Sequence, residues 1–502
     1  MTPESSDEVD YQKSEHTIEN EKPLKNRWVI LYLMVMCPFV STLNSSITNV
    51  GLPVISDSLQ VSTSAVNWIV TAYLIVTSST ILFFGRLGDM IGNTRVLQGG
   101  MLTFTIGSLL CGLSPNFGLL IAARILQAVG SGAVMANNHG IITRTFPKNE
   151  RGRALGINGA FVALGTMTGP SIGGLILTFA DWKYLFLINV PVGGLIFLLQ
   201  QRFLPKEERK KPGVMDYPGA VLFFSFIAAL FAALQQVQAL GISHPFVVIC
   251  LVVSAISFIF FLRRQLRYRF RLLDLSIFKN KWFSISLFCA FTSYLAIQSA
   301  NLVLPFYLQD VLFFSPGLSG LYMTIYPLVL MMVSPVSGYL SDRIGAESIT
   351  LAGIILTGGG LFLISTLDDK SPNLLLILFI SIMAVGNGMF QSPNNSLVMS
   401  SVPGNIVGVG GSINALVRNI GQNFGVVLAT LLLYNGISAT LGYHVTDYAP
   451  GNPEAFANGM RITFQAVGAI CLAGAVLTAL RLIGFKHEKK RSVEFAAAPE
   501  KS

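Results

Sequence analysis

Apolar runs of about twenty residues recur along this chain, from Trp28 to the region of Arg481. A helix needs about 20 such residues to cross a hydrocarbon core of about 30 Å. A transmembrane β-barrel would instead show segments of about ten residues with alternating polarity. Charged residues make up only 12% of the sequence, roughly half of their usual share in soluble domains. These features predict an all-α polytopic membrane protein and argue against soluble enzymes, nucleic-acid-binding proteins and secreted disulfide scaffolds.

Charged residues and Pro/Gly clusters divide the sequence into fourteen predicted helices. They cover approximately residues 28–49, 64–84, 96–113, 118–140, 154–178, 184–200, 217–238, 245–262, 283–308, 318–340, 348–366, 373–397, 406–434 and 460–482. Cytoplasmic loops are enriched in Lys and Arg, and only Lys183, Lys370 and Arg461 fall in the loops opposite the N terminus. We therefore predict a multi-pass protein of the plasma membrane, with both termini cytoplasmic and one long external loop at about 436–458.

A short motif occurs twice in the sequence. Residues 85–92 and 338–345 both read G-x-L-x-D-x-I-G, and they lie 253 residues apart. Matching the second helix to the tenth predicts two equivalent six-helix bundles, with two helices inserted between them. Secondary transporters have such duplicated halves and bind substrate between them. The predicted segments are an N-terminal tail (1–27), a first bundle (28–200), a linker with the inserted helices (201–282), a second bundle (283–483) and a C-terminal tail (484–502).

The first copy of this motif combines an acid with two bases at a junction between helices. In one conformation such an acid can lie near a helix N terminus and pair with a neighbouring base. An ordinary positively charged loop is the alternative interpretation, and the second copy makes it less favourable. We predict a conformational latch that comprises Gly85, Arg86, Asp89, Gly92, Arg95 and Asp342.

The fourth and fifth predicted helices each carry an unusual feature. Arg124 lies within the fourth, and a buried arginine in a membrane almost always faces a cavity or a partner, unless its side chain reaches to the interface. Closely spaced glycines with a proline give the fifth helix a bare face for close packing and a kink. The residues of this second motif are Gly165, Gly169, Pro170, Gly173 and Gly174.

Together these segments closely resemble motifs of the major facilitator superfamily. Residues 85–95 resemble its loop motif between helices 2 and 3, residues 124–132 its fourth-helix arginine motif, and residues 156–174 the antiporter motif of drug–proton exchangers. Residues 43–53 resemble the first-helix signature of fourteen-span drug:proton antiporters, which carries aspartate where this chain has Asn44. The resemblance implies the major facilitator fold and a multidrug efflux transporter.

In this superfamily the cavity is lined chiefly by the first and fourth helices of each half. In this chain these are the first, fourth, ninth and twelfth helices, and their polar residues follow steps of three, four or seven along one face. A shared aqueous cavity would satisfy such polar faces, and so would hydrogen bonds between helices without ligand contact. The predicted substrate and proton cavity comprises Asn44, Thr48, Arg124, Gln127, Tyr294, Gln298, Asn301, Asn387, Gln391 and Arg418.

We predict a secondary active transporter that exports lipophilic or amphipathic compounds by alternating access, with proton antiport. The alternatives are a proton-independent facilitator or lipid flippase and, less favoured, a membrane-embedded enzyme or sensor. The expected partners are small amphipathic substrates, protons and membrane lipids. No catalytic residue, metal, cofactor or nucleic acid is expected, and the protein is expected to be a monomer.

Two charge features refine this prediction. All Asp and Glu residues fall in loops, tails or helix ends, whereas Arg124 and Arg418 lie within predicted helices. A low-dielectric cavity with the positive charge of these arginines favours anionic or neutral amphiphiles over lipophilic cations. Asn44 has no proton to exchange, so weak transport driven by a pH gradient is expected.

Overall fold

The computed structural model describes residues 26–61, 63–66, 68–205, 214–268, 270–403, 406–443 and 452–496. In these ranges it is built of helices joined by short connections, without a strand. The helices before the inserted segment are α2 (Arg27–Leu59), α3 (Thr63–Val66), α4 (Trp68–Ile91), α5 (Asn93–Gly112), α6 (Phe117–Thr145), η1 (Lys148–Glu150), α7 (Arg151–Phe179), α8 (Tyr184–Leu187) and α9 (Asn189–Phe203). The inserted helices are α10 (Tyr217–Leu240) and α11 (Pro245–Arg267). The helices after them are η2 (Leu275–Lys279), α12 (Lys281–Phe306), η3 (Tyr307–Val311), α13 (Pro316–Met323), α14 (Ile325–Ile344), α15 (Ala346–Ile364), α16 (Asn373–Ser400), α17 (Val407–Leu441) and α18 (Pro453–Ala496).

Among the described residues, thirteen helices are long and apolar enough to cross a membrane. Each of the fourteen predicted helices overlaps a helix of the structure, but α5 is not among these thirteen candidates. Its 20 residues include the polar residues Asn93, Arg95 and Gln98, which lower its mean hydropathy. Length and composition therefore support thirteen spans, one fewer than the sequence predicted.

Several helices extend beyond their predicted ends. α2 continues past Pro53 to Leu59, and α18 begins at Pro453 and continues to Ala496, into the predicted C-terminal tail. Since α17 ends at Leu441 and α18 begins at Pro453, the external loop predicted at 436–458 was too long. An apolar run marks the part of a helix that lies in lipid, whereas the helix itself continues while its backbone hydrogen bonds can be made. The predicted N-terminal tail lies outside the described residues except for its last two.

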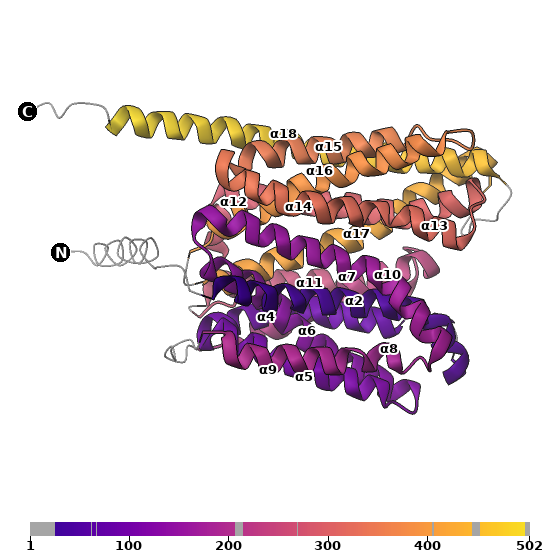
Figure 1. Cartoon of the computed structure of the whole chain (residues 1–502), viewed down its shortest axis with the longest axis horizontal. Coiled ribbons are helices and arrows are strands. Elements are labelled where there is room, and N and C mark those ends of the chain that lie inside the picture. Colours follow the sequence, from indigo (N-terminus) through magenta and orange to yellow (C-terminus); the bar gives the residue numbers. More distant parts are fainter. Residues whose placement is uncertain are drawn as a thin grey trace, which may run out of the picture.

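The helices form two groups that lie side by side with roughly parallel axes (Figure 1). In the first group α2 packs against α7, and α6 against α4 and α5; in the second, α12 packs against α17, and α15 against α16 and α18. The groups meet where α7 packs against α14 and where α17 packs against α4 and α6. The inserted α10 and α11 pack against each other, and α10 covers the seam between α4 and α17.

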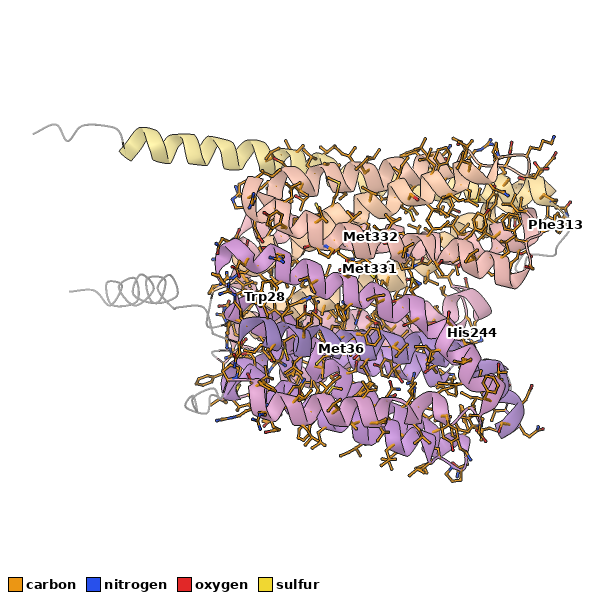
Figure 2. The ribbon with its side chains drawn as sticks, viewed as in Figure 1. Trp28, Met36, His244, Phe313, Met331 and Met332 are labelled. Atoms are coloured by element: carbon orange, nitrogen blue, oxygen red, sulfur yellow. The ribbon has the colours of Figure 1, made fainter. Side chains whose placement is uncertain are left out.

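The two ends of the molecule can be followed from single residues. Trp28 at the start of α2 lies at one end, whereas His244 before α11 and Phe313 after η3 lie at the opposite end (Figure 2). Arg27 also forms an ion pair with Glu150 at 3.0 Å, which places the first turn of α7 beside the start of α2. We refer to this end as the α2 end.

Candidate functional site

Asp89 in the last turn of α4 joins the two helix groups at the α2 end. Its carboxylate accepts hydrogen bonds from the backbone N–H groups of Gly408 (2.8 Å) and Val409 (2.9 Å), in the first turn of α17. Arg144 lies 3.7 Å from the same carboxylate, and Asp89 is only 6% exposed. The first amides of a helix have no partner within the helix, and the helix dipole favours an anion there. Asp89 thus stabilises the contact between α4 and α17.

Asp342 makes the same contact in the opposite direction. At the end of α14, its carboxylate accepts hydrogen bonds from the backbone N–H groups of Gly152 and Arg153, both at 2.9 Å. These amides belong to the first turn of α7. Each copy of the repeated motif therefore places its acid on a helix N terminus of the other group. The sequence predicted an acid near a helix N terminus, and the structure identifies α17 and α7 as the helices concerned.

The repeated motif is the end of a helix rather than a loop. α4 continues through Asp89 to Ile91, and only Gly92 separates it from α5. Gly92 has φ +108°, and its counterpart Gly345 between α14 and α15 has φ +96°. Residues other than glycine rarely adopt this backbone conformation. Gly85 lies so close to α17 that an added Cβ would be 2.7 Å from the Gly408 carbonyl oxygen. The glycines thus permit both the sharp turn and the close crossing.

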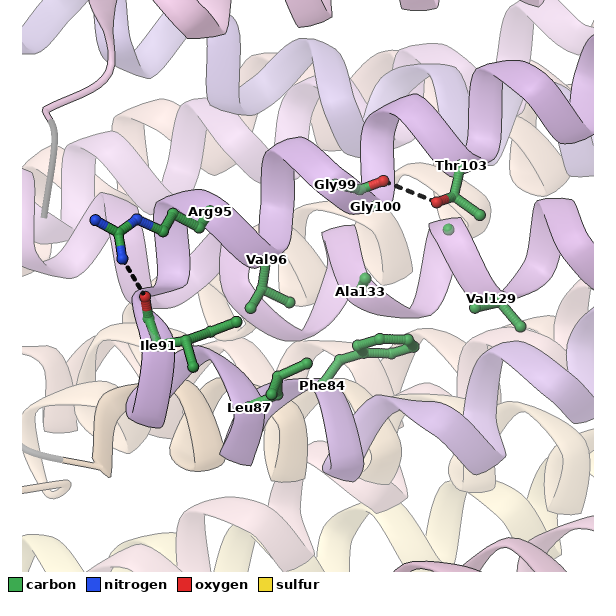
Figure 3. Close-up of a pocket in the computed structure, with 11 residues that line it drawn as sticks. Phe84, Leu87, Ile91, Arg95, Val96, Gly99, Gly100, Thr103, Val129 and Ala133 are labelled. Atoms are coloured by element: carbon green, nitrogen blue, oxygen red, sulfur yellow. Dashed lines mark hydrogen bonds between the residues drawn. The ribbon is translucent and has the colours of Figure 1, made fainter. Parts of the chain in front are cut away.

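An arginine from outside the motif lies near its acid. The base near Asp89 is Arg144 of α6, whereas Arg95 donates a hydrogen bond to the Ile91 carbonyl at 3.4 Å, and Arg86 forms no ion pair with another described residue. Arg95 lies at one end of a groove of about 260 Å³ between α4, α5 and α6, with mostly apolar walls that include Phe84 (Figure 3).

Arg124 is the centre of a buried polar network in the first group. Its guanidinium donates to Gln127 Oε1 at 2.6 Å and to the Ile69 carbonyl at 3.1 Å. The guanidinium also lies over the rings of Tyr73 (4.5 Å) and Phe186 (5.4 Å). Such cation–π contacts stabilise a desolvated cation. Arg124 is 0% exposed, and one of its terminal nitrogens, Nη2, has no hydrogen-bond partner among the described residues.

Asn44 belongs to the same network. Its Oδ1 accepts hydrogen bonds from Gln127 and Asn189, each at 3.2 Å. Gln127 also donates to Ser108 Oγ at 2.7 Å, and the Thr48 hydroxyl donates to the Asn44 carbonyl oxygen at 2.6 Å. These side chains are almost fully buried. In this conformation, the predicted cavity residues of the first group are hydrogen-bonded to one another, although Nη2 of Arg124 is not part of this network.

The predicted cavity residues of the second group divide into two kinds. Asn387 is buried and bonded, since it accepts from the Tyr326 hydroxyl at 3.0 Å and donates to Ser293 Oγ at 2.8 Å. The remaining predicted side chains on α12 and α16 form no hydrogen bond with another described residue. None of them has a fully buried polar atom that lacks a hydrogen-bond partner. These residues are Tyr294, Gln298, Asn301 and Gln391. Their polar atoms are therefore not engaged in hydrogen bonds with other described residues.

Arg418 lies on α17 at the seam between the two groups. Its Nη2 approaches Met135 Sδ of α6 at 3.5 Å, and the next residue, Asn419, donates to Ser78 Oγ of α4 at 2.9 Å. Both contacts cross from the second group to the first. The side chain of Arg418 is partly exposed.

The glycines of the fifth-helix motif bring α7 against α2. An added Cβ at Gly165 would collide with Thr42, and one at Gly169 with Ser46. At Gly173 it would lie 3.1 Å from Ile47 Cγ1, whereas at Gly174 it would meet nothing within 4 Å. Three of the four glycines therefore serve close packing. α7 remains helical through the position of Pro170.

Sequence reasoning missed several members of these networks. Tyr73, Phe186 and Ser108 complete the surroundings of Arg124 and Gln127, and the first turns of α7 and α17 supply the amides for the two acids. A polar residue inside an apolar run was a usable signal for Ser108. The backbone amides could not be predicted in this way, because no side-chain pattern marks which amides bind the two acids.

A family model described as Major Facilitator Superfamily matches residues 34–421 and 286–501 of the chain. The chain belongs to the Major Facilitator Superfamily. Family and fold are those of transporters, which are not enzymes.

Relatives of this Major Facilitator Superfamily chain carry different functional names. It is 34% identical over 458 residues to the riboflavin transporter RibZ of Clostridioides difficile (strain 630), covering 91% of the chain and 97% of RibZ. It is 28% identical over 413 residues to the multidrug resistance protein Stp of Mycobacterium tuberculosis (strain CDC 1551 / Oshkosh), covering 82% and 77%. The structure of the proton:xylose symporter XylE bound to 6-bromo-6-deoxy-D-glucose matches with a TM-score of 0.63 at 13% identity, covering 91% of the chain and 95% of XylE. This last likeness shows the fold.

Proposed function

We propose that this protein exports lipophilic or amphipathic compounds across the plasma membrane by alternating access. The observation that carries the proposal is the pair of contacts from Asp89 to α17 and from Asp342 to α7. Both contacts hold the two helix groups together at one end of the molecule. In alternating access one end closes while the other opens, so these contacts act as a latch for the closed α2 end.

The proposed architecture has fourteen spans in two six-helix bundles, 28–200 and 283–483, with α10 and α11 in the linker 201–282. α5 is the additional span, since 20 residues at about 1.5 Å each reach across a core of about 30 Å. The matched pairing of α7 with α14 and of α4 with α17 supports two equivalent bundles. On this topology the α2 end and both tails, 1–27 and 484–502, are cytoplasmic, and the protein functions as a monomer surrounded by membrane lipids.

Proton antiport is the proposed driving reaction, as in the drug:proton antiporters that the first-helix and antiporter motifs resemble. Inward movement of one charge through 100 mV releases about 2.3 kcal/mol. A proton-independent facilitator or flippase is the second candidate, and one observation favours it. Asn44 occupies the position of the resembled family's aspartate and is held by amide groups of Gln127 and Asn189, which exchange no proton.

Uptake of labelled compounds into reconstituted vesicles, with and without an imposed pH gradient, tests these proposals. Because one relative is named for riboflavin and another for multidrug resistance, labelled riboflavin and a labelled lipophilic dye are the probes. Faster uptake with the gradient supports antiport, and uptake that ignores the gradient supports the facilitator. No uptake of either probe above protein-free vesicles would contradict the proposed export function.

A further inference from the structure

Arg418 is bonded more weakly than Arg124 and Arg481, two buried arginines of the spanning helices. Arg124 has two hydrogen-bond acceptors and two aromatic rings, and Arg481 donates to Ser286 Oγ at 2.6 Å. Among the described residues, the only side-chain partner of Arg418 is the Met135 thioether at 3.5 Å. A thioether sulfur is a weak acceptor, so the Arg418 cation is left almost uncompensated.

The depth of Arg418 makes this lack of compensation significant. It lies nine residues beyond Val409, whose amide binds Asp89, and at 1.5 Å per residue this is about 14 Å deeper along α17. Such a depth is close to the middle of a hydrocarbon core of about 30 Å. A charge in that position normally pairs with another charge or faces a functional cavity. Every Asp and Glu whose side chain the structure describes lies at a helix end or in a connection.

The surroundings of Arg418 suit a ligand with an apolar body and one anionic group. Tyr294 of α12 packs against α17 beside Arg418, with its Cβ 3.2 Å from an added Cβ at Gly421, and its hydroxyl has no bond to another described residue. Met135 is a flexible side chain that repacks easily. An anionic group can therefore displace the sulfur while the aromatic and thioether side chains contact the apolar body.

We propose that Arg418 binds the anionic group of an amphiphilic substrate, a carboxylate or sulfonate, at the seam between the two helix groups. This inference rests on the proposed export function and names its substrate class. Because Arg418 belongs to the second group and Met135 to the first, an anion at this site replaces a contact that now joins the groups. Binding there is thus linked to their relative movement.

Two dyes with the same apolar body test the assignment. 8-Anilinonaphthalene-1-sulfonate carries one sulfonate, and N-phenyl-1-naphthylamine lacks it. Fluorescence titration of the protein in lipid nanodiscs, corrected with empty nanodiscs, measures the affinity for each dye. Charged hydrogen bonds contribute about 1.5–3 kcal/mol, so Arg418→Gln should weaken binding of the sulfonate about 10- to 100-fold and leave the neutral dye almost unchanged.

Three further variants make the result specific. Arg418→Lys should restore most of the affinity for the sulfonate, and Met135→Leu should keep or increase it, because it removes the competing sulfur. Arg461→Gln is the matched control, since Arg461 is an exposed arginine on α18. An equal loss of affinity for both dyes in Arg418→Gln, or no loss of affinity for either dye, would overturn the assignment.

Inorganic anions and transport provide the remaining comparisons. If sodium sulfate alone displaced the sulfonate dye at equal ionic strength, the site would belong to a free anion and not to a substrate. Selective binding of the sulfonate without transport into vesicles would contradict the proposed function but leave the anion site intact. Transport of both dyes with equal sensitivity to Arg418→Gln would support export and refute this site.

Discussion

Replacing Asp89 by asparagine should open the α2 end and stop transport. Asparagine keeps the shape and one acceptor oxygen, so it can hold only one of the two amides that Asp89 binds at 2.8 and 2.9 Å. Loss of one charged hydrogen bond amounts to about 1.5–3 kcal/mol, and loss of the favourable charge at the helix N terminus to about 0.3–1 kcal/mol. Arg144, at 3.7 Å and 30% exposed, adds a small amount.

The sum is about 2–4 kcal/mol, which shifts the balance between closed and open forms about 30- to 700-fold. Distances between spin labels at Asn149→Cys and Pro403→Cys, both exposed positions on opposite sides of the seam, measure this shift, with the partly exposed Cys250 changed to serine. The distance should lengthen in Asp89→Asn while expression and membrane insertion stay normal. Asp342→Asn should act in the same direction but more weakly, since no arginine of the described residues forms an ion pair with it.

Asp369→Asn, in the exposed connection between α15 and α16, is the matched control and should change neither distance nor transport. Unchanged distances and near-normal transport by a well-expressed Asp89→Asn protein would refute the latch. The motif would then have only a topological role.

Two other substitutions test the first helix and its packing. Asn44→Asp can keep the acceptor contacts to Gln127 and Asn189 and adds a titratable group, so it should raise uptake driven by a pH gradient in vesicles; unchanged uptake would contradict the coupling role of this position. Gly169→Ala forces a Cβ onto Ser46 and should destabilise the purified protein by about 1–3 kcal/mol, as followed by thermal unfolding, whereas Gly174→Ala has open space and should change stability by less than about 0.5 kcal/mol.

The positions of the two acids were predictable because the motif repeats. The 253-residue spacing of Asp89 and Asp342 identified equivalent helix ends, and acids are favoured at helix N termini. Their partners were not predictable, because backbone amides of Gly152 and Gly408 leave no signature in side-chain pattern. Helix ends were also misjudged, since α2 and α18 continue well beyond their apolar runs.

Helical spacing identified the polar helix faces of the candidate cavity. It did not predict whether their side chains are buried and hydrogen-bonded. Asn44, Gln127, Gln298 and Gln391 are all amide side chains on polar helix faces. The first two are buried and hydrogen-bonded, whereas the last two form no hydrogen bond with another described residue. That difference depends on which helices pack against each face in this conformation. A linear pattern contains no such information, whereas the contacts of α5 and α9 with the other helices of the first group supply it.

A reversible cross-link across the seam tests the central claim, that the α2 end must open in every transport cycle. An added Cβ at Gly140 of α6 would lie 3.5 Å from Val407 Cγ1 of α17, which suits a disulfide between Gly140→Cys and Val407→Cys. Oxidation of the double variant should reduce uptake into vesicles to the level of protein-free vesicles, and a reductant should restore it. Uptake by each single variant should not change with either treatment. Full transport by the cross-linked protein would contradict the account.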